Sequence, residues 1–227
     1  MRFKTLVVAL ILSLVCLIPR VSFADTLTLT TAGGETSGGE FVYPYYLTDS
    51  GPGGTTPMVA MGCLNVDRDV NFGETWEATV INVSTVTPSE TIDNESGLDI
   101  LADAYLFNQF AGANGNGYVI SDIQWAIWSV MDPSAVAGNI AFTSNAQNLA
   151  TTALSVVSNA NLNYSQFAND NLFVPINGTQ TPGYGEPQML MTDPAPPAAT
   201  PEPTSLILMG TGMLGAVAIM RRKYRKV

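Results

Sequence analysis

Residues 26–85 contain segments that alternate between polar and apolar residues or are rich in aromatic and β-branched residues, as β-strands are. Clusters of Gly, Pro, Ser and Thr at 32–39 and 50–57 predict loops between the strands. The strand segments are "TLTLTT" from Thr26, "EFVYPYYL" at 40–47, "MVAMGCLNV" at 58–66 and "WEATVINVST" at 76–85.

The pattern then changes to the period of α-helices. "GLDILADAYLFNQFAG" at 97–112 and "TSNAQNLATTALSVVSN" at 143–159 read as helices. Between them, "SDIQWAIWSVMDP" predicts a helix that begins with Ser121 as N-cap and ends before Pro133. Two strand-like segments follow, "NLFVPI" and "PQMLMT". We therefore expect one α+β domain over 25–192, a β-sheet or sandwich with a helical insertion.

Residues 1–24 have the three parts of a secretory signal peptide, which would form an N-terminal helix before its removal. A basic start and an apolar stretch precede the small-x-small site that ends at Ala24. Cleavage there would make Asp25 the first mature residue. It would also remove Cys16 and leave Cys63 as the only cysteine.

The other end holds a Pro/Ala-rich linker at 193–203, an uncharged apolar stretch at 204–220 and a basic tail at 221–227. The apolar stretch has the length of a short transmembrane helix, and the tail predicts that its end stays cytoplasmic. The linker ends in a Pro-Glu-Pro triplet: Pro201, Glu202 and Pro203.

This C-terminal arrangement resembles the PEP-CTERM sorting signal of Gram-negative bacteria. The resemblance implies an exported protein that is held briefly in the inner membrane and processed by an exosortase. It also implies a final place on the cell surface or in an extracellular exopolysaccharide or biofilm matrix.

Charge excludes one class of function. From Asp25 to Glu202, Arg68 is the single basic residue against all 19 acidic residues, a net charge of about −18. Such a field repels phosphate backbones, so we expect no nucleic-acid partner. The chain has no histidine, which excludes Ser-His-Asp and Cys-His catalysis and argues against a zinc enzyme.

A lone cysteine in an exported domain has four readings: a buried inert thiol, an intermolecular disulfide, a reactive nucleophile or an unusual crosslink. The apolar neighbours of Cys63 suit the first of these. Gln124, on the helix that begins near Ser121, suggests the last. Ser121-x-x-Gln124 also fits a capping box, which needs no function.

The segments around Cys63 and Gln124 together resemble the thioester domains of bacterial surface adhesins. That family pairs a Cys-apolar strand motif, here Cys63-Leu64, with an "apolar-Gln-x-x-apolar-Trp-x-apolar" helix, here residues 123–130. This chain has Gly62 where the family has a bulky residue before the cysteine. The resemblance implies an internal thioester between Cys63 and Gln124, with Ile127 and Trp128 as supporting residues.

The resemblance predicts a covalent adhesin that acylates an amine or hydroxyl of a surface ligand or exopolysaccharide once, without turnover. The alternative is a structural envelope or matrix protein of the same fold without a thioester. Asp122 would move a proton during thioester formation, or else simply favour the helix N-terminus.

Two acidic patterns carry weaker expectations. "NVDRDVNFG" at 65–73 suggests a calcium loop but lacks the EF-hand glycine and glutamate. We therefore expect no cofactor, with a calcium site in this loop as the alternative. Glu95, Asp99 and Asp103 are spaced by four residues and predict an acidic helix face that meets solvent.

Overall fold

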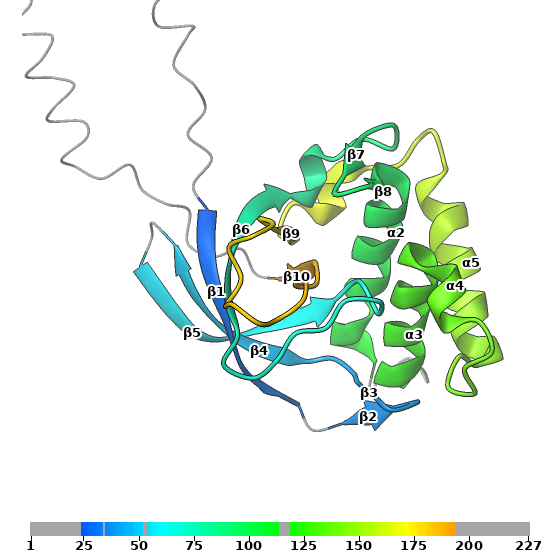
Figure 1. Ribbon diagram of the computed structural model, residues 1–227. Helices are drawn as coiled ribbons and strands as arrows, with labels where there is room; N and C mark the ends of the chain where they lie inside the picture. Colours follow the sequence, from blue (N-terminus) through cyan, green and yellow to red (C-terminus); the bar gives the residue numbers. More distant parts are fainter. Residues whose placement is uncertain (1–23, 34, 52–53, 114–118, 194–227) are drawn as a thin grey trace, which may run out of the picture.

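The computed structural model describes residues 24–33, 35–51, 54–113 and 119–193. Six strands of this part close into an antiparallel barrel in the order β1-β4-β5-β10-β9-β6 (Figure 1). Their bounds are β1 Ala24–Ala32, β4 Tyr45–Gly51, β5 Gly54–Cys63, β6 Thr75–Asn82, β9 Asn171–Pro175 and β10 Leu190–Thr192.

The mixed helix and strand composition is confirmed, but the strands form neither an open sheet nor a sandwich. The barrel closes because β6 pairs with β1, where Trp76 lies opposite Leu27, and because β10 joins β5 to β9. Closure leaves no unpaired sheet edge in the barrel. Two short hairpins lie outside it, β2 (Thr36–Ser37) with β3 (Glu40–Phe41) and β7 (Thr91–Ile92) with β8 (Glu95–Ser96).

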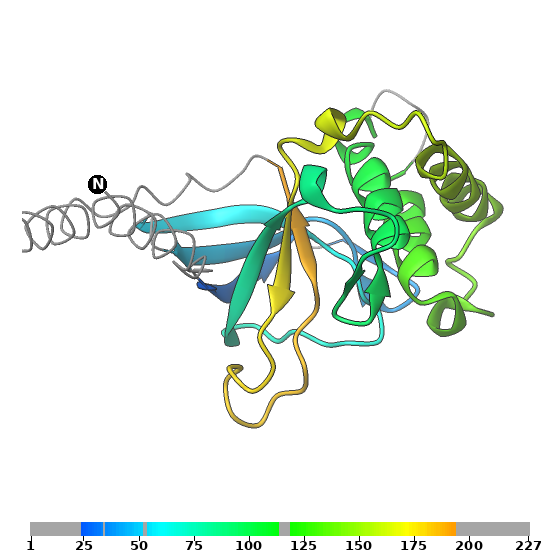
Figure 2. The same ribbon diagram turned by 90° about the horizontal axis from the view of Figure 1, so that it is seen from above.

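Four α-helices of the described part lie on one side of the barrel, with α5 packed against α2 and α3, as two perpendicular views show (Figures 1 and 2). They are α2 Gly97–Phe107, α3 Ile120–Met131, α4 Pro133–Val136 and α5 Ser144–Val157. Three 3-10 turns, η1 Val83–Thr85, η2 Phe110–Gly112 and η3 Tyr164–Phe167, join these elements. Nine of the twelve residues of α3 are buried, so α3 is a core helix.

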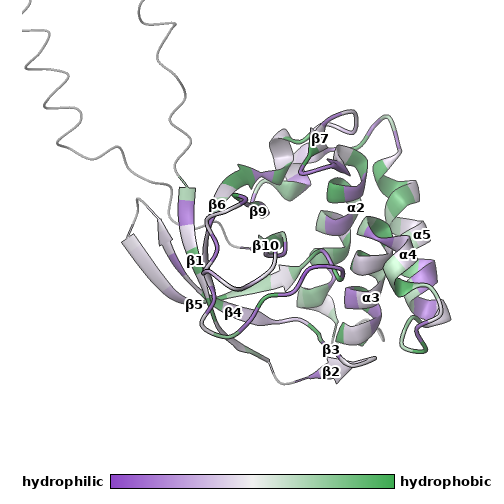
Figure 3. Ribbon diagram, in the orientation of Figure 1, coloured by the Kyte–Doolittle hydropathy of each residue, from purple (hydrophilic) through white to green (hydrophobic). Residues whose placement is uncertain are grey.

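Strand β5 runs from solvent into the core. Gly54 and Thr55 at its start are exposed, whereas Met61, Gly62 and Cys63 at its end are buried. Figure 3 shows broad hydrophobic stretches along α2, on the helical side of the barrel. The barrel and the helices share one core, and Cys63 lies within it.

Two local predictions are wrong. The loop expected at 50–57 is mostly strand, because β4 extends to Gly51 and β5 begins at Gly54. The N-cap of α3 is Val119, without a side-chain hydrogen bond, and Ser121 lies inside the helix. Gln124 therefore does not form the expected capping box.

The described residues contain no helix with the length and apolar character needed to cross a bilayer. The predicted signal peptide up to residue 23, and the segments at 194–203, 204–220 and 221–227, lie outside the described residues. Ala24 and Asp25, which flank the predicted cleavage site, are the first two residues of β1.

Candidate functional site

The structure brings Cys63 and Gln124 together although they are 61 positions apart in the sequence. Cys63 is the last residue of β5, and Gln124 lies in the second turn of α3. The Gln124 side-chain Nε2 donates a hydrogen bond of 2.7 Å to the backbone carbonyl of Cys63. Both residues have no exposed surface. The carboxamide of Gln124 thus lies against the residue that carries the only thiol of the described chain.

The hydrogen bonding of this amide is incomplete. Gln124 Oε1 is buried and accepts no hydrogen bond from any described residue. Trp128 lies four residues later on α3, and its indole Nε1 is a buried donor without an acceptor in the same part of the chain. Residues at i and i+4 share one helix face. An acceptor and a donor without partners therefore lie on the same side of α3. Each of them lowers stability, because it has lost its hydrogen bonds to water and gained none in return.

Burial raises the pKa of the Cys63 thiol to about 12, so the thiol is neutral at pH 7. The indole N–H of Trp128 lies close enough to the sulfur to oppose this rise in pKa, although its geometry falls short of a hydrogen bond. The thiol itself donates to the carbonyl of Asn65 at 3.2 Å. To react as a nucleophile, Cys63 would have to lose its thiol proton inside the buried core.

A cluster of aromatic side chains covers the end of β5. A Cβ atom on Gly62 would come within 2.8 Å of the Phe107 ring and 3.7 Å of Phe110. Tyr43 stacks on Phe110 with ring centroids 4.1 Å apart, and both rings meet Phe107 edge to face. Phe107, from α2, therefore fills the space in front of Gly62 where the adhesin pattern has a bulky side chain on the strand itself.

Asp103 does not lie on a solvent-facing surface, so that expectation was wrong. It has no exposed surface, and neither carboxyl oxygen forms a hydrogen bond within the described residues. It precedes Phe107 by one helical turn, on the face of α2 that approaches Gly62. Burial raises the pKa of Asp103 well above its usual range, with smaller contributions from Asp99 and Glu95. A charge on Asp103 would in turn raise the pKa of Cys63.

No motif in the sequence marks Asp103 as a functional residue. The sequence does contain one sign that this part of α2 is buried on nearly all sides. The neighbours of Asp103 are apolar: Leu101, Ala102, Ala104 and Leu106.

The other two supporting residues, Asp122 and Ile127, lie on the same helix as Gln124. Ile127 is fully buried in the core, beside Trp128 on α3. The Asp122 carboxylate accepts hydrogen bonds from Thr143 Oγ1 at 2.6 Å and Asn145 Nδ2 at 3.3 Å. Thr143 is the N-cap of α5, so the hydrogen bonds of Asp122 link α3 to the start of that helix. A role for Asp122 in proton transfer stays a prediction.

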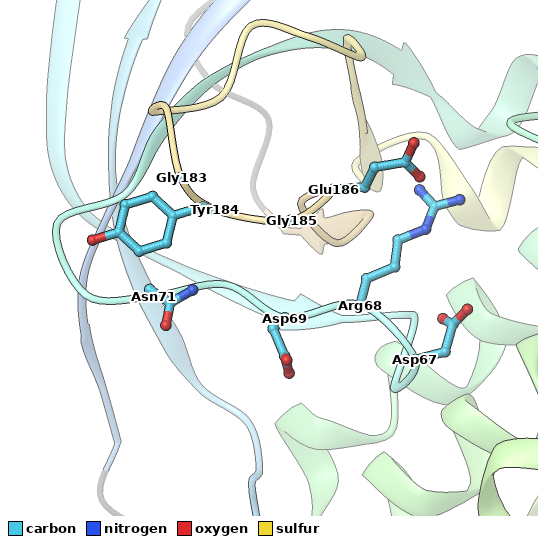
Figure 4. Close-up of a pocket in the computed structure, with 8 residues that line it drawn as sticks. All are labelled: Asp67, Arg68, Asp69, Asn71, Gly183, Tyr184, Gly185 and Glu186. Atoms are coloured by element: carbon cyan, nitrogen blue, oxygen red, sulfur yellow. The ribbon is translucent and has the colours of Figure 1, made fainter.

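A separate, open pocket of about 680 Å³ lies between the β5–β6 and β9–β10 loops (Figure 4). Arg68 forms an ion pair of 2.6 Å with Asp93 beside it. In Figure 4 its side chain extends between those of Asp67 and Glu186. The pocket is lined by Asp67, Arg68, Asp69, Asn71, Gly183, Tyr184, Gly185 and Glu186.

The calcium expectation falls on this same loop. Within the described ranges, no three His, Cys, Asp or Glu side chains are grouped closely enough to hold a metal ion. The acidic residues of 65–73 therefore do not form a metal cluster of that kind, and one of their neighbours, Arg68, contributes a positive charge.

Comparison with known proteins identifies one feature of the chain. Residues 199–223 match the PEP-CTERM protein-sorting motif. This motif defines the class: an exported protein that an exosortase processes at the membrane, where the chain is anchored transiently. No curated protein and no solved structure matches the chain.

Proposed function

We propose that this protein is a covalent surface adhesin whose reactive group is a thioester between Cys63 Sγ and the side-chain carbonyl carbon of Gln124. The observation that carries this proposal is the hydrogen bond from the Gln124 amide to Cys63, which holds the amide beside the cysteine. The export signal supports it, because such a group would be used outside the cell.

Formation of the thioester needs no outside reagent. The sulfur attacks the amide carbon, the C–S bond forms, and the C–N bond breaks. Ammonia leaves with the proton that the thiol loses. An amide is a poor electrophile, so the reaction depends on prior alignment of the two groups. Such alignment supplies about 7–11 kcal/mol in favourable intramolecular reactions. A site held between a barrel strand and a core helix provides rigid alignment of this kind.

Burial protects the bond and also limits its use. Neither Cys63 nor Gln124 is exposed, so water is kept from the thioester. Transfer to a partner therefore requires Phe107, Phe110 or a neighbouring element to move. A nucleophilic amine or hydroxyl of the partner then attacks the Gln124 carbonyl and frees the Cys63 thiol. The protein acts once and does not turn over.

The acceptor that best fits the charge of the chain carries an amine. The domain has one basic residue and no lysine between the two terminal signals, and its strongly negative field attracts protonated amines at low salt. The absence of lysine would also prevent copies of the protein from acylating one another on a crowded surface.

A structural matrix protein without the thioester is the second candidate. It is favoured by the fact that Cys63 and Gln124 each make a hydrogen bond that requires no chemistry. In that case the cysteine is a core residue and the glutamine holds α3 to β5.

The intact mass of the recombinant 25–200 segment distinguishes the two candidates. We expect the folded wild type to be lighter than its sequence by one ammonia, and to gain one methylamine on incubation with that amine. Cys63→Ala and Gln124→Ala should both have the mass of their sequence. A folded wild type at full sequence mass would exclude the thioester and leave the structural role.

A further inference from the structure

We infer that the indole N–H of Trp128 is the hydrogen-bond donor that stabilises the oxyanion on Gln124 Oε1 when the Cys63 thioester forms and when it is cleaved. This inference rests on the proposed function. It assigns to Trp128 a direct part in the chemistry, beyond the supporting role that the resemblance implies.

Polar atoms that are left unused carry the inference. Buried indole N–H groups usually find an acceptor, and a buried donor without one costs free energy. Trp128 is 1% exposed, and its Nε1 has no hydrogen-bond partner in the described chain. The Gln124 Oε1 acceptor on the same face of α3 also has none. The indole N–H lacks an acceptor, and the amide oxygen lacks a donor.

The other tryptophan of α3 shows that the unused donor is not a general property of this helix. Trp125 packs edge to face on Trp128, with ring centroids 5.0 Å apart. Its Nε1 donates to Ser37 Oγ at 3.1 Å. Of these two indoles, that of Trp128 is the one close to Cys63, and its N–H has no hydrogen-bond partner among the described residues.

The position of the sulfur completes the geometry. Trp128 Nε1 is near enough to Cys63 to counteract the effect of burial on its thiol pKa. Gln124 Nε2 is bonded to the Cys63 carbonyl. The donor is therefore close to the nucleophile and shares a helix face with the carbonyl that the nucleophile attacks.

The reaction explains why an unsatisfied donor is useful here. When sulfur adds to the amide carbon, the C=O double bond opens and negative charge collects on Oε1. A donor that is already in place in a water-free site stabilises this charge without any rearrangement of the site. The same oxygen becomes negative when an amine attacks the finished thioester, so both directions of the chemistry depend on the donor.

The test replaces the donor and keeps the ring. Trp128→Phe removes the N–H and retains most of the packing. Trp76→Phe is the matched control, because Trp76 is also 1% exposed and also has a buried Nε1 without a partner among the described residues. Trp76 lies on β6, which is not paired with β5.

The measurement is the rate at which methylamine cleaves the thioester, followed by intact mass on folded protein. Removing one oxyanion donor typically slows a reaction about 10²–10³-fold. We expect a loss of this order for Trp128→Phe, or no ammonia loss at all in this folded variant. Trp76→Phe should react like the wild type. Equal rates for Trp128→Phe and Trp76→Phe would overturn the inference.

A second readout applies if Trp128→Phe does not fold. The infrared C=O stretch of the wild-type thioester, isolated by a ¹³C label on glutamine and by subtraction of Cys63→Ala, should be lower than that of a simple alkyl thioester in an apolar solvent. It should also shift when exchangeable protons are replaced by deuterium. An unshifted band overturns the inference while the ammonia deficit still upholds the thioester. A wild type without the deficit overturns the proposed function itself.

Discussion

The molecule has two polar sites that differ in how their polar groups are satisfied. The pocket of Figure 4 is open, and its Arg68 forms an ion pair with Asp93. The Cys63–Gln124 site is closed, and it contains polar atoms of Gln124, Trp128 and Asp103 that bond to no described residue. Water can satisfy the open pocket at little cost. The buried site carries a cost in stability, because its unpaired polar atoms have lost their contact with water, and costs of this kind are common at functional sites.

The largest effect should come from removing the aromatic cover of the buried site. Phe107 is 5% exposed and contacts both Tyr43 and Phe110. Phe107→Ala leaves a cavity and should lower the free energy of unfolding by about 3–5 kcal/mol in chemical denaturation. Tyr184→Ala in the open pocket is the control and should change it by less than about 0.5 kcal/mol. Similar losses for the two variants would contradict the difference between the sites.

A smaller effect is expected at Gly62. Gly62→Ala places a methyl group 2.8 Å from the Phe107 ring, which is held by two other aromatic rings. Overpacking of this kind costs about 1–3 kcal/mol. Combining it with Phe107→Leu should cost less than the sum of the two single changes, measured as a double-mutant cycle. Strict additivity would show that the two residues do not compete for this space.

Asp103 predicts a dependence of stability on pH. Its pKa is raised in the folded protein, so the folded state holds the proton more tightly than the unfolded chain. The free energy of unfolding should therefore decrease as pH rises above the unfolded pKa of about 4 towards the folded pKa, by up to about 1.4 kcal/mol per pH unit. Asp103→Asn should remove this slope, with a gain at pH 8 and little change at pH 4.

Asp132 is the control for the direction in which stability changes with pH. Its hydrogen bond with Ser134 lowers its pKa, so the stability that it contributes is present at neutral pH and is lost on acidification. Asp132→Asn should therefore lower stability at neutral pH and leave the slope due to Asp103 intact. Thermal unfolding of both variants across this range tests the pair. A wild-type slope that persists in Asp103→Asn would assign it to another group.

The smallest effect is expected in the open pocket. Asp93→Asn breaks the ion pair with Arg68. The Arg68 side chain is 15% exposed and the Asp93 side chain is 12% exposed. Ion pairs that keep contact with water contribute about 0.2–1 kcal/mol and weaken with salt. Denaturation at low and high salt should show the loss shrink as salt is added. A loss as large as that of Phe107→Ala would mean that the pocket is a second structural centre.

Local pattern predicted most of the elements and few of their partners. Alternation placed β1 and β6, and the helical period placed α2, α3 and α5 within a few residues of their observed bounds. Closure of the barrel depends on pairings such as β6 with β1, which are remote in sequence and leave no local signal. The end of β4 and the start of β5, within 50–57, were predicted as loop because Gly and Pro residues there favour turns.

The candidate site shows the same division. The resemblance to adhesin domains selected Cys63, Gln124 and Trp128, and the structure places the first two in contact. The resemblance did not predict that Phe107 fills the space beside Gly62. Periodicity put Asp103 on a helix face correctly, but it could not show what that face meets.

The sequence alone determined that the chain ends in a sorting signal, has a strongly acidic domain and holds a single thiol there, because these properties belong to composition and short motifs. Only the tertiary structure showed that the Gln124 amide lies against the backbone of that cysteine, which donor has no partner nearby and which acid loses contact with water. Those properties arise from groups on different elements that share one dry space, and packing alone brings them there.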